Sequence, residues 1–258
     1  MKLYLNFFLM HLKSHMQYKA SFLMVMVGQF LSACTCFLGI YFMFTRFHAV
    51  EGFTYQQALL CFAAVGMAFA LTEMFAQGFQ MFDRMLGNGE FDRSLVRPRG
   101  AIFLTLASHM DFSRLGLMVQ NAIVLAYAVS KSGVVWRWDK ILTLCLMILC
   151  GSAVFFALFV VQAAFAFFTT ESLEFMNILT YGGREFGRYP FAVYGRGILG
   201  FLTYVIPLAL FQYYPLLYLL DRQSGVLYML TPLLSVFFLL PAYGFFRLGL
   251  RRYKSTGS

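Results

Sequence analysis

The sequence predicts an all-α polytopic membrane protein with about six transmembrane helices, and composition is the first reason. Of its 258 residues, 60 % are hydrophobic and the mean hydropathy is +0.71, whereas soluble domains contain about 45–50 % apolar residues. Length is the second reason, because a spanning helix takes about 20 apolar residues and the chain has about six such runs. No room is left for a separate soluble domain, so we treat residues 1–258 as a single transmembrane domain.

The first 20 residues predict an amphipathic helix that lies along the membrane surface. Phe7, Phe8 and Leu12 are interspersed with Lys13 and Lys19, which makes the segment too charged to cross a bilayer. A secretory signal peptide has an unbroken apolar core and a small-residue cleavage site, and neither is present here. Residues 1–20 are therefore expected to form an interfacial helix.

Two apolar runs, at about 21–44 and 58–82, predict the first two spans. Glu73 is the only carboxylate well inside a predicted span, and Gln77 follows one helical turn later. A charge at the centre of a span costs about 2.5–3.5 kcal/mol on insertion scales, so we expect Glu73 to face protein or water. It could line a translocation path or make a hydrogen bond between helices, and the sequence leaves both open.

A charged segment follows the second span at residues 83–111. Its centre is G-N-G-E-F-D-R-S-L-V-R-P-R-G, from Gly87 to Gly100. A helix of two turns is predicted between Gly89 and Val96, and Pro98 disfavours its continuation. Composition alone would also fit an ordinary loop whose arginines only set the orientation of the chain.

The remaining apolar runs predict four more spans. The first of them ends at about Ser130, and the other three cover about 141–168, 191–212 and 226–246. Gln162 in the fourth span is a further candidate for a translocation path. Pro207 in the fifth span, and Pro232 and Pro241 in the sixth, predict kinked or broken helices. A polar segment at 169–190 precedes the fifth span, and a tyrosine-rich elbow at 213–225 follows it.

The positions of lysine and arginine predict that both termini are cytoplasmic. Three lie in the first 20 residues, five between Arg84 and Arg114, three between Arg184 and Arg196 and four from Arg247 onward, which leaves five for the outer loops. This asymmetry follows the positive-inside rule. It places 83–111 and 169–190 in the cytoplasm and the elbow outside. Because these residues are spread over four membrane-proximal segments, no nucleic-acid partner is expected.

Motifs for chemistry are missing from the sequence. A phosphate-binding loop needs G-x-x-x-x-G-K-[ST] after a strand, and the chain has no such pattern. We also find no protease or hydrolase motif, no carboxylate pair inside the membrane and no cluster with metal-ligand spacing. We therefore expect no catalytic residue, no metal site, no cofactor and no bound nucleotide in this chain.

Four short motifs, in this order and spacing, carry a resemblance to a known family. They are G-E-F-D-R-S-L-V-R-P at 89–98, R-Y-P at 188–190, I-P at 206–207 and Y-Y-P at 213–215. Nearly the whole chain resembles permease subunits of the ABC-2 class of ABC transporters. The resemblance implies a subunit of an ATP-driven exporter in a bacterial inner membrane. Its implied partners are a second permease, identical or homologous, and a separate ATPase dimer that binds ATP and Mg²⁺.

The resemblance also implies where the ATPase would bind. The family's coupling helix corresponds to Glu90–Val96, with Phe91 and Leu95 as an apolar anchor. The ion pairs that select the ATPase would come from four charged residues: Glu90, Asp92, Arg93 and Arg97. The first 20 residues correspond to the family's connecting helix, and Asn177–Tyr189 would be a second cytoplasmic contact. The substrate is not implied.

An alternative from another class is a six-span membrane enzyme or a passive channel that works without an ATPase. The missing catalytic motifs argue against an enzyme, and the lack of a filter-like loop argues against a channel. A neighbouring gene for an ATPase with a phosphate-binding loop would favour the transporter.

The predicted orientation can be tested by cysteine labelling after the native cysteines have been replaced. A cysteine at Ser94 should react with an impermeant reagent only when the cytoplasmic side is exposed, whereas one at Gln223 should react in intact cells. Labelling of position 94 from outside would contradict the six-span arrangement.

Overall fold

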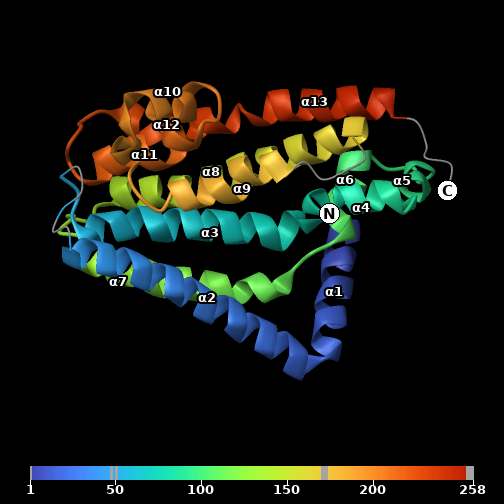
Figure 1. Cartoon of the computed structure of the whole chain (residues 1–258), viewed down its shortest axis with the longest axis horizontal. Helices are drawn as coiled ribbons and strands as arrows, with labels where there is room; N and C mark the ends of the chain where they lie inside the picture. Colours follow the sequence, from blue (N-terminus) through green and yellow to red (C-terminus); the bar gives the residue numbers. More distant parts are fainter. Residues whose placement is uncertain (1, 47–48, 50–51, 170–173, 254–258) are drawn as a thin grey trace.

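The computed structural model describes residues 2–46, 49, 52–169 and 174–253, and shows a bundle of helices with no strand in these ranges (Figure 1). Residues 170–173 of the polar segment and 254–258 of the basic tail lie outside the described ranges. The elements in chain order are α1 (Lys2–Gln17), α2 (Lys19–Arg46), α3 (Tyr55–Gln80), α4 (Phe82–Gly87), α5 (Glu90–Leu95), α6 (Ala101–Ser108), η1 (Phe112–Arg114), α7 (Leu115–Lys131), α8 (Trp138–Thr169), α9 (Glu174–Phe186), η2 (Phe191–Tyr194), α10 (Gly195–Tyr204), α11 (Leu208–Leu219), α12 (Val226–Val236) and α13 (Leu239–Arg252).

The expected number of spans is confirmed within the described residues. Five helical stretches are long and apolar enough to cross a membrane, and there is a sixth if one bent pair counts as a single span. The long helices run between two ends of the bundle (Figure 1). We call the end with α4, α5 and the last turn of α13 the charged end. The opposite end, with the connections at 132–137 and 220–225, is the elbow end.

Helices α3 and α8 form the centre of the bundle. Thr54 caps α3 through a reciprocal pair of hydrogen bonds with Gln57, which fixes where this buried helix begins. Farther along, the ring of Phe69 packs edge-on against Phe155 of α8 with centroids 5.0 Å apart. The Thr72 hydroxyl donates to the Ser152 carbonyl of α8 at 2.9 Å. Almost all of α3 is covered by its neighbours, so it is a core helix and faces little lipid.

The charged end is built around an aromatic cluster of Phe82, Phe91, Phe167, Phe246 and Tyr253. These rings come from α4, α5, α8, α13 and the residue after α13, and the Phe82 and Phe91 centroids are 4.9 Å apart. Edge-to-face aromatic pairs of this kind contribute about 0.5–1.5 kcal/mol beyond their buried area. The short helices α4 and α5 are thus packed firmly onto two of the long ones.

Helix α1 leaves the bundle at a steep angle to α2 (Figure 1). His11 and His15, on one face of α1, place their Nε2 atoms 3.0 Å from the carbonyl oxygens of Ala107 and Met110, in and just after α6. These contacts join α1 to the segment that follows α5. An interfacial position for α1 stays a prediction.

The predicted fifth span, 191–212, corresponds to a bent pair of helices, and the segment before it packs against the long helices. Helix α9 lies along α8 and α3, and the ideal Cβ position at Gly187 is 2.9 Å from Val65 in the middle of α3. The described part of the 169–190 segment therefore packs against α3 and α8, and its cytoplasmic position stays a prediction. Residues 191–219 contain η2, α10 and α11, and the axis turns by 116° at the break.

The prolines correctly predicted broken helices, whereas the elbow is shorter than predicted. Pro207 stands at the start of α11, at the bend, and the sixth span is interrupted between α12 and α13 at Phe237 and Phe238. The predicted elbow at 213–225 is shorter, because α11 continues through Pro215 to Leu219. Only the connection at 220–225 is a loop.

Gly66 lies where α3 and α7 approach each other closely. A Cβ at position 66 would lie 2.1 Å from Asn121 Oδ1, and the buried Asn121 is held by a 2.8 Å hydrogen bond to the Leu117 carbonyl. Gly66→Ala should lower the free energy of unfolding by about 1–3 kcal/mol, as overpacking does. The double variant Gly66→Ala/Asn121→Ala should recover most of the loss in thermal unfolding of the purified chain.

The matched control is Gly28→Ala in α2, where an added Cβ meets no atom within 4 Å. It should leave the unfolding midpoint nearly unchanged. Equal midpoints for Gly66→Ala and Gly28→Ala would contradict the close approach.

Candidate functional site

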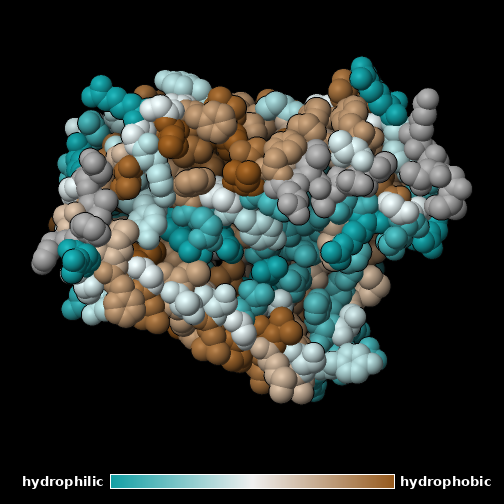
Figure 2. Space-filling view, viewed as in Figure 1, coloured by the Kyte–Doolittle hydropathy of each residue, from teal (hydrophilic) through white to brown (hydrophobic). Residues whose placement is uncertain are grey.

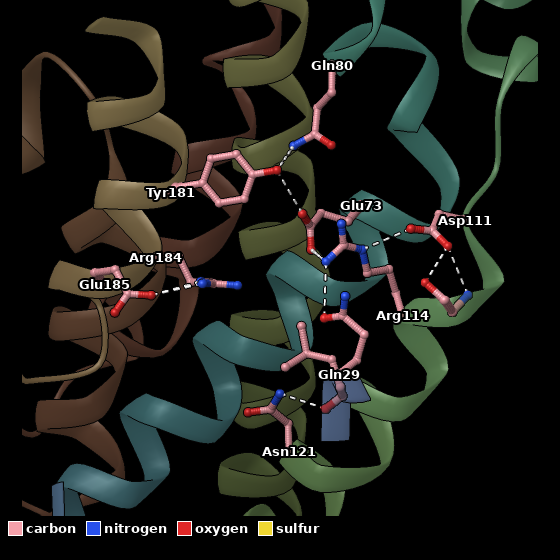
Figure 3. Close-up of polar contacts among 11 residues, drawn as sticks. Gln29, Glu73, Gln80, Asp111, Arg114, Asn121, Tyr181, Arg184 and Glu185 are labelled. Atoms are coloured by element: carbon pink, nitrogen blue, oxygen red, sulfur yellow. Dashed lines mark hydrogen bonds and ion pairs between the residues drawn. The ribbon is translucent and has the colours of Figure 1, made fainter. Parts of the chain in front are cut away.

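A buried ion pair lies at the centre of the candidate site. Glu73 of α3 is 0 % exposed, and its Oε2 lies 3.3 Å from Arg114 Nη1 of η1. The Tyr181 hydroxyl of α9 donates to the other carboxylate oxygen at 3.2 Å. Figure 3 shows these side chains converging from three separate elements.

Further polar groups extend this pair into a network. Asp111 Oδ2 lies 3.2 Å from Arg114 Nε, and Arg114 Nη1 donates to Gln29 Oε1 of α2 at 3.4 Å. The Gln80 amide donates to the Tyr181 hydroxyl at 3.0 Å. The network connects α2, α3, η1 and α9, which are far apart in the sequence.

Two arginines, Arg184 of α9 and Arg188 in the turn after it, stand next to this network. Arg184 donates to Glu185 Oε1 from Nη2 at 2.9 Å and from Nε at 3.2 Å, and its guanidinium lies 4.8 Å from the centroid of the Phe69 ring. Figure 3 shows Arg184 pointing toward Glu73 and Arg114. Arg188 pairs with the second oxygen of Glu185 and donates to Cys36 Sγ at 3.2 Å.

These side chains surround a cavity of about 160 Å³, which we call the arginine cavity. Four helices and η1 contribute to its wall. The lining residues are Gln29, Ser32, Ala33, Cys36, Phe62, Gly66, Arg114, Leu117, Asn121, Tyr181, Arg184 and Arg188. Asn121 is buried, and its Oδ1 accepts no hydrogen bond from the described residues.

A second cavity of about 430 Å³ continues toward the elbow end. It shares Cys36 and Arg188 with the arginine cavity and adds Gly39, Ile40 and Glu185. The α2 residues along both cavities recur every three or four positions, from Gln29 to Ile40, so they form one face of the helix. The two cavities together follow α2 along the bundle axis.

The structure agrees with the expectation that Glu73 faces protein. Its contacts are an ion pair and a hydrogen bond between helices, and it stands behind the arginine cavity instead of in its wall. Gln77 and Gln162 are half-buried and line neither cavity. Their side-chain oxygens are buried without a hydrogen bond to the described residues. Their role in a translocation path stays a prediction.

Sequence reasoning missed the arginines that line the cavity. Arg184 and Arg188 were assigned to a cytoplasmic loop because charges normally end a span. A signal was present in the glycines of α9 and of the turn that follows it. Gly183 and Gly187 are four residues apart, and this spacing of small residues lets helices pack closely in a membrane.

The predicted coupling residues form α5 and the turn that follows it. Phe91 is 0 % exposed and sits inside the aromatic cluster, so it is turned toward the chain's own core. Leu95 is 44 % exposed and Val96 is 87 % exposed. Glu90 and Asp92 are half-buried, whereas Arg93 and Arg97 are exposed.

A double-mutant cycle can measure the central ion pair. Glu73→Ala should lower the free energy of unfolding by about 3–5 kcal/mol, because it leaves a buried charge without its partner. Glu73→Gln combined with Arg114→Gln should cost less than the two single changes together, as expected for residues in direct contact. Thermal unfolding in one detergent gives the comparison.

The pair of exposed Arg137 and half-buried Asp139, whose charged atoms are 3.7 Å apart, serves as the control pair near the surface. Its cycle should show no coupling, because surface ion pairs are weak. Additive effects of the Glu73 and Arg114 changes would mean that the two residues do not interact.

Comparison with known proteins places the chain in a family. Residues 30–257 match the family model described as an ABC-2 family transporter protein. No curated protein and no solved structure matches the chain. The match begins inside α2, at Phe30, and from there it covers the other predicted spans and both polar segments. It confirms the resemblance drawn from the sequence motifs. The chain belongs to the ABC-2 family of transporter proteins.

Proposed function

We propose that this chain is the permease subunit of an ATP-driven exporter in a bacterial inner membrane, with both termini in the cytoplasm. It forms half of the translocation path and is driven by a separate ATPase dimer, which binds ATP and Mg²⁺. One observation carries the coupling part of the proposal. The short charged helix α5 is fixed by buried aromatic rings to the ends of α8 and α13.

Such an attachment suits the transfer of force. Phe91 lies 5.5 Å from both Phe167 and Tyr253, measured between ring centroids, and the Tyr253 hydroxyl donates to Asp92 at 3.0 Å. Burial, together with this hydrogen bond, raises the pKa of Tyr253 to about 12, so the hydroxyl keeps its proton at physiological pH. A displacement of α5 would therefore move the ends of two spans with it.

The outer side of α5 carries the groups that an ATPase could recognise. Leu95 and Val96 expose apolar side chains, and Arg93 and Arg97 flank them with positive charge. Apolar anchors surrounded by charged groups are typical of protein interfaces, where charge favours the correct partner. In this proposal Phe91 positions α5, and Leu95 and Val96 make the contact.

The hydrophilic surface between α2 and α9 supports the proposal of a second permease. Figure 2 shows hydrophilic atoms across the middle of this face, between hydrophobic zones over α10 and α12 and along α2. Exposed polar groups at the depth of the spans are costly in lipid. A second permease, identical or homologous, would cover this face and complete the path around the two cavities.

Two substitutions at α5 distinguish a residue that contacts the ATPase from one that holds α5 in position. Val96→Asp should leave the thermal unfolding midpoint unchanged and weaken co-purification of the ATPase, because the side chain is exposed. Phe91→Ala should lower the free energy of unfolding by about 3–5 kcal/mol, as large core truncations do. Affinity purification of the tagged chain from its own host, with mass spectrometry, identifies the ATPase and quantifies its recovery.

Lys131→Ala, at the elbow end, is the control and should change neither measurement. Full ATPase recovery with Val96→Asp and with Arg97→Glu would show that α5 is not the contact. Recovery of the chain with no ATPase in any preparation would refute the exporter itself.

A further inference from the structure

We propose that the arginine cavity binds one anionic group, a phosphate or a carboxylate, at the head of an amphipathic molecule that the exporter moves. This inference rests on the proposed function, because it assigns a class of substrate to the same path. Three guanidinium groups and no carboxylate belong to the described wall of the cavity. The carboxylates Glu73, Asp111 and Glu185 bind these guanidinium groups from outside that wall.

The arginines keep donors available for a ligand. A guanidinium has five N–H donors in a rigid fork. Arg184 directs Nε and Nη2 to Glu185, and its Nη1 has no hydrogen bond to the described residues. Arg188 Nη2 contacts only the thiol of Cys36 in this part of the chain, and sulfur is a weak acceptor. An anionic oxygen would be a stronger acceptor for both.

The ion pairs hold these arginines in place before a ligand arrives. Glu185 binds both Arg184 and Arg188, and the rings of Phe69 and Phe62 lie 4.8 Å and 5.8 Å from the two guanidinium carbons. Arg114 is held on the opposite wall by Glu73 and Asp111. Arginines positioned in this way can bind phosphate or carboxylate oxygens in a bidentate manner.

A further observation points to a ligand that carries a donor as well. Asn121 lines the same cavity, is buried, and has an amide oxygen without a hydrogen bond to any described residue. A buried acceptor of this kind costs free energy unless a ligand or water satisfies it. A hydroxyl next to the anionic group, or a protonated phosphate oxygen, would do so.

The volume of the arginine cavity suits the head group of an amphipathic molecule better than the whole molecule. The cavity of about 160 Å³ is smaller than the roughly 300–1,000 Å³ of pockets that enclose drug-sized ligands. The neighbouring cavity along Gly39 and Ile40 leads away from Arg188, and α2 exposes apolar side chains to the bilayer. An apolar chain can extend in either direction while its head stays between the arginines.

Equilibrium binding to the purified full chain in nanodiscs of zwitterionic lipid tests this proposal. The probes share one alkyl chain and differ in the head: dodecyl phosphate, dodecyl trimethylammonium and neutral dodecyl maltoside. Dodecyl phosphate should bind saturably, and the other two should not. Arg184→Gln and Arg188→Gln should each weaken binding about tenfold or more, as expected for losing a hydrogen bond between charged groups.

Glu185→Gln should have the opposite effect and tighten binding, because it frees donors on both arginines and removes a competing anion. This variant keeps the test valid if an arginine variant does not fold. Arg137→Gln is the matched control, since its side chain is 75 % exposed at the elbow end, and it should not change affinity.

Inorganic phosphate, added as a competitor, distinguishes the source of the anion. Displacement of dodecyl phosphate would indicate a site for free anions as well, and no displacement would indicate lipid-like molecules. Saturable binding of the cationic probe, or unchanged affinity in Arg188→Gln and Glu185→Gln, would overturn the proposal. No ATPase is needed, so failure to co-purify one would refute the exporter and leave the binding result valid.

Discussion

Charge compensation at the depth of the spans determines how this bundle is arranged. Glu73 is completely buried, and a carboxylate in that position requires partners. Its partners come from η1 and α9, and Arg114 adds α2 through Gln29. The position of α9 follows the same requirement, because its Tyr181 hydroxyl donates to Glu73, while Glu185 pairs locally with Arg184 and Arg188. Separation of these elements would leave several charges unpaired in an apolar medium.

Hydropathy and charge predicted most of the fold. Five apolar helices lie close to the predicted places, and prolines marked the breaks near 207 and 237. The predicted fifth span corresponds to a bent pair of helices at 191–219. Hydropathy did not reveal that the segment before it packs along α3 and α8, because hydropathy treats each residue independently. Arg184, Glu185 and Arg188 each count against a span, although together they neutralise much of one another's charge. Such pairing depends on geometry that a window of sequence does not contain.

The candidate site was predicted only in part, for a related reason. Glu73 was identifiable as the one carboxylate in an apolar run, but its partners are far away in sequence. Arg114 and Tyr181 are brought to it by the packing of α7 and α9 on α3. Phe91 was expected to anchor the contact with the ATPase, but periodicity does not say which neighbour covers a side chain. Here the covering rings belong to α4, α8 and the residue after α13.

Helix α2 is attached to the bundle much more loosely than the central helices α3 and α8. Of its 28 residues, only Ala33, Ile40 and Phe44 are buried. Free energy from burial grows with the apolar area removed from water, and in a bilayer it falls further, since lipid solvates the same surface. Tilting α2 away is therefore inexpensive, and it would open the wall beside Gln29 and Cys36 to the bilayer. A molecule already dissolved in one leaflet could then reach the arginines sideways, without passing through water.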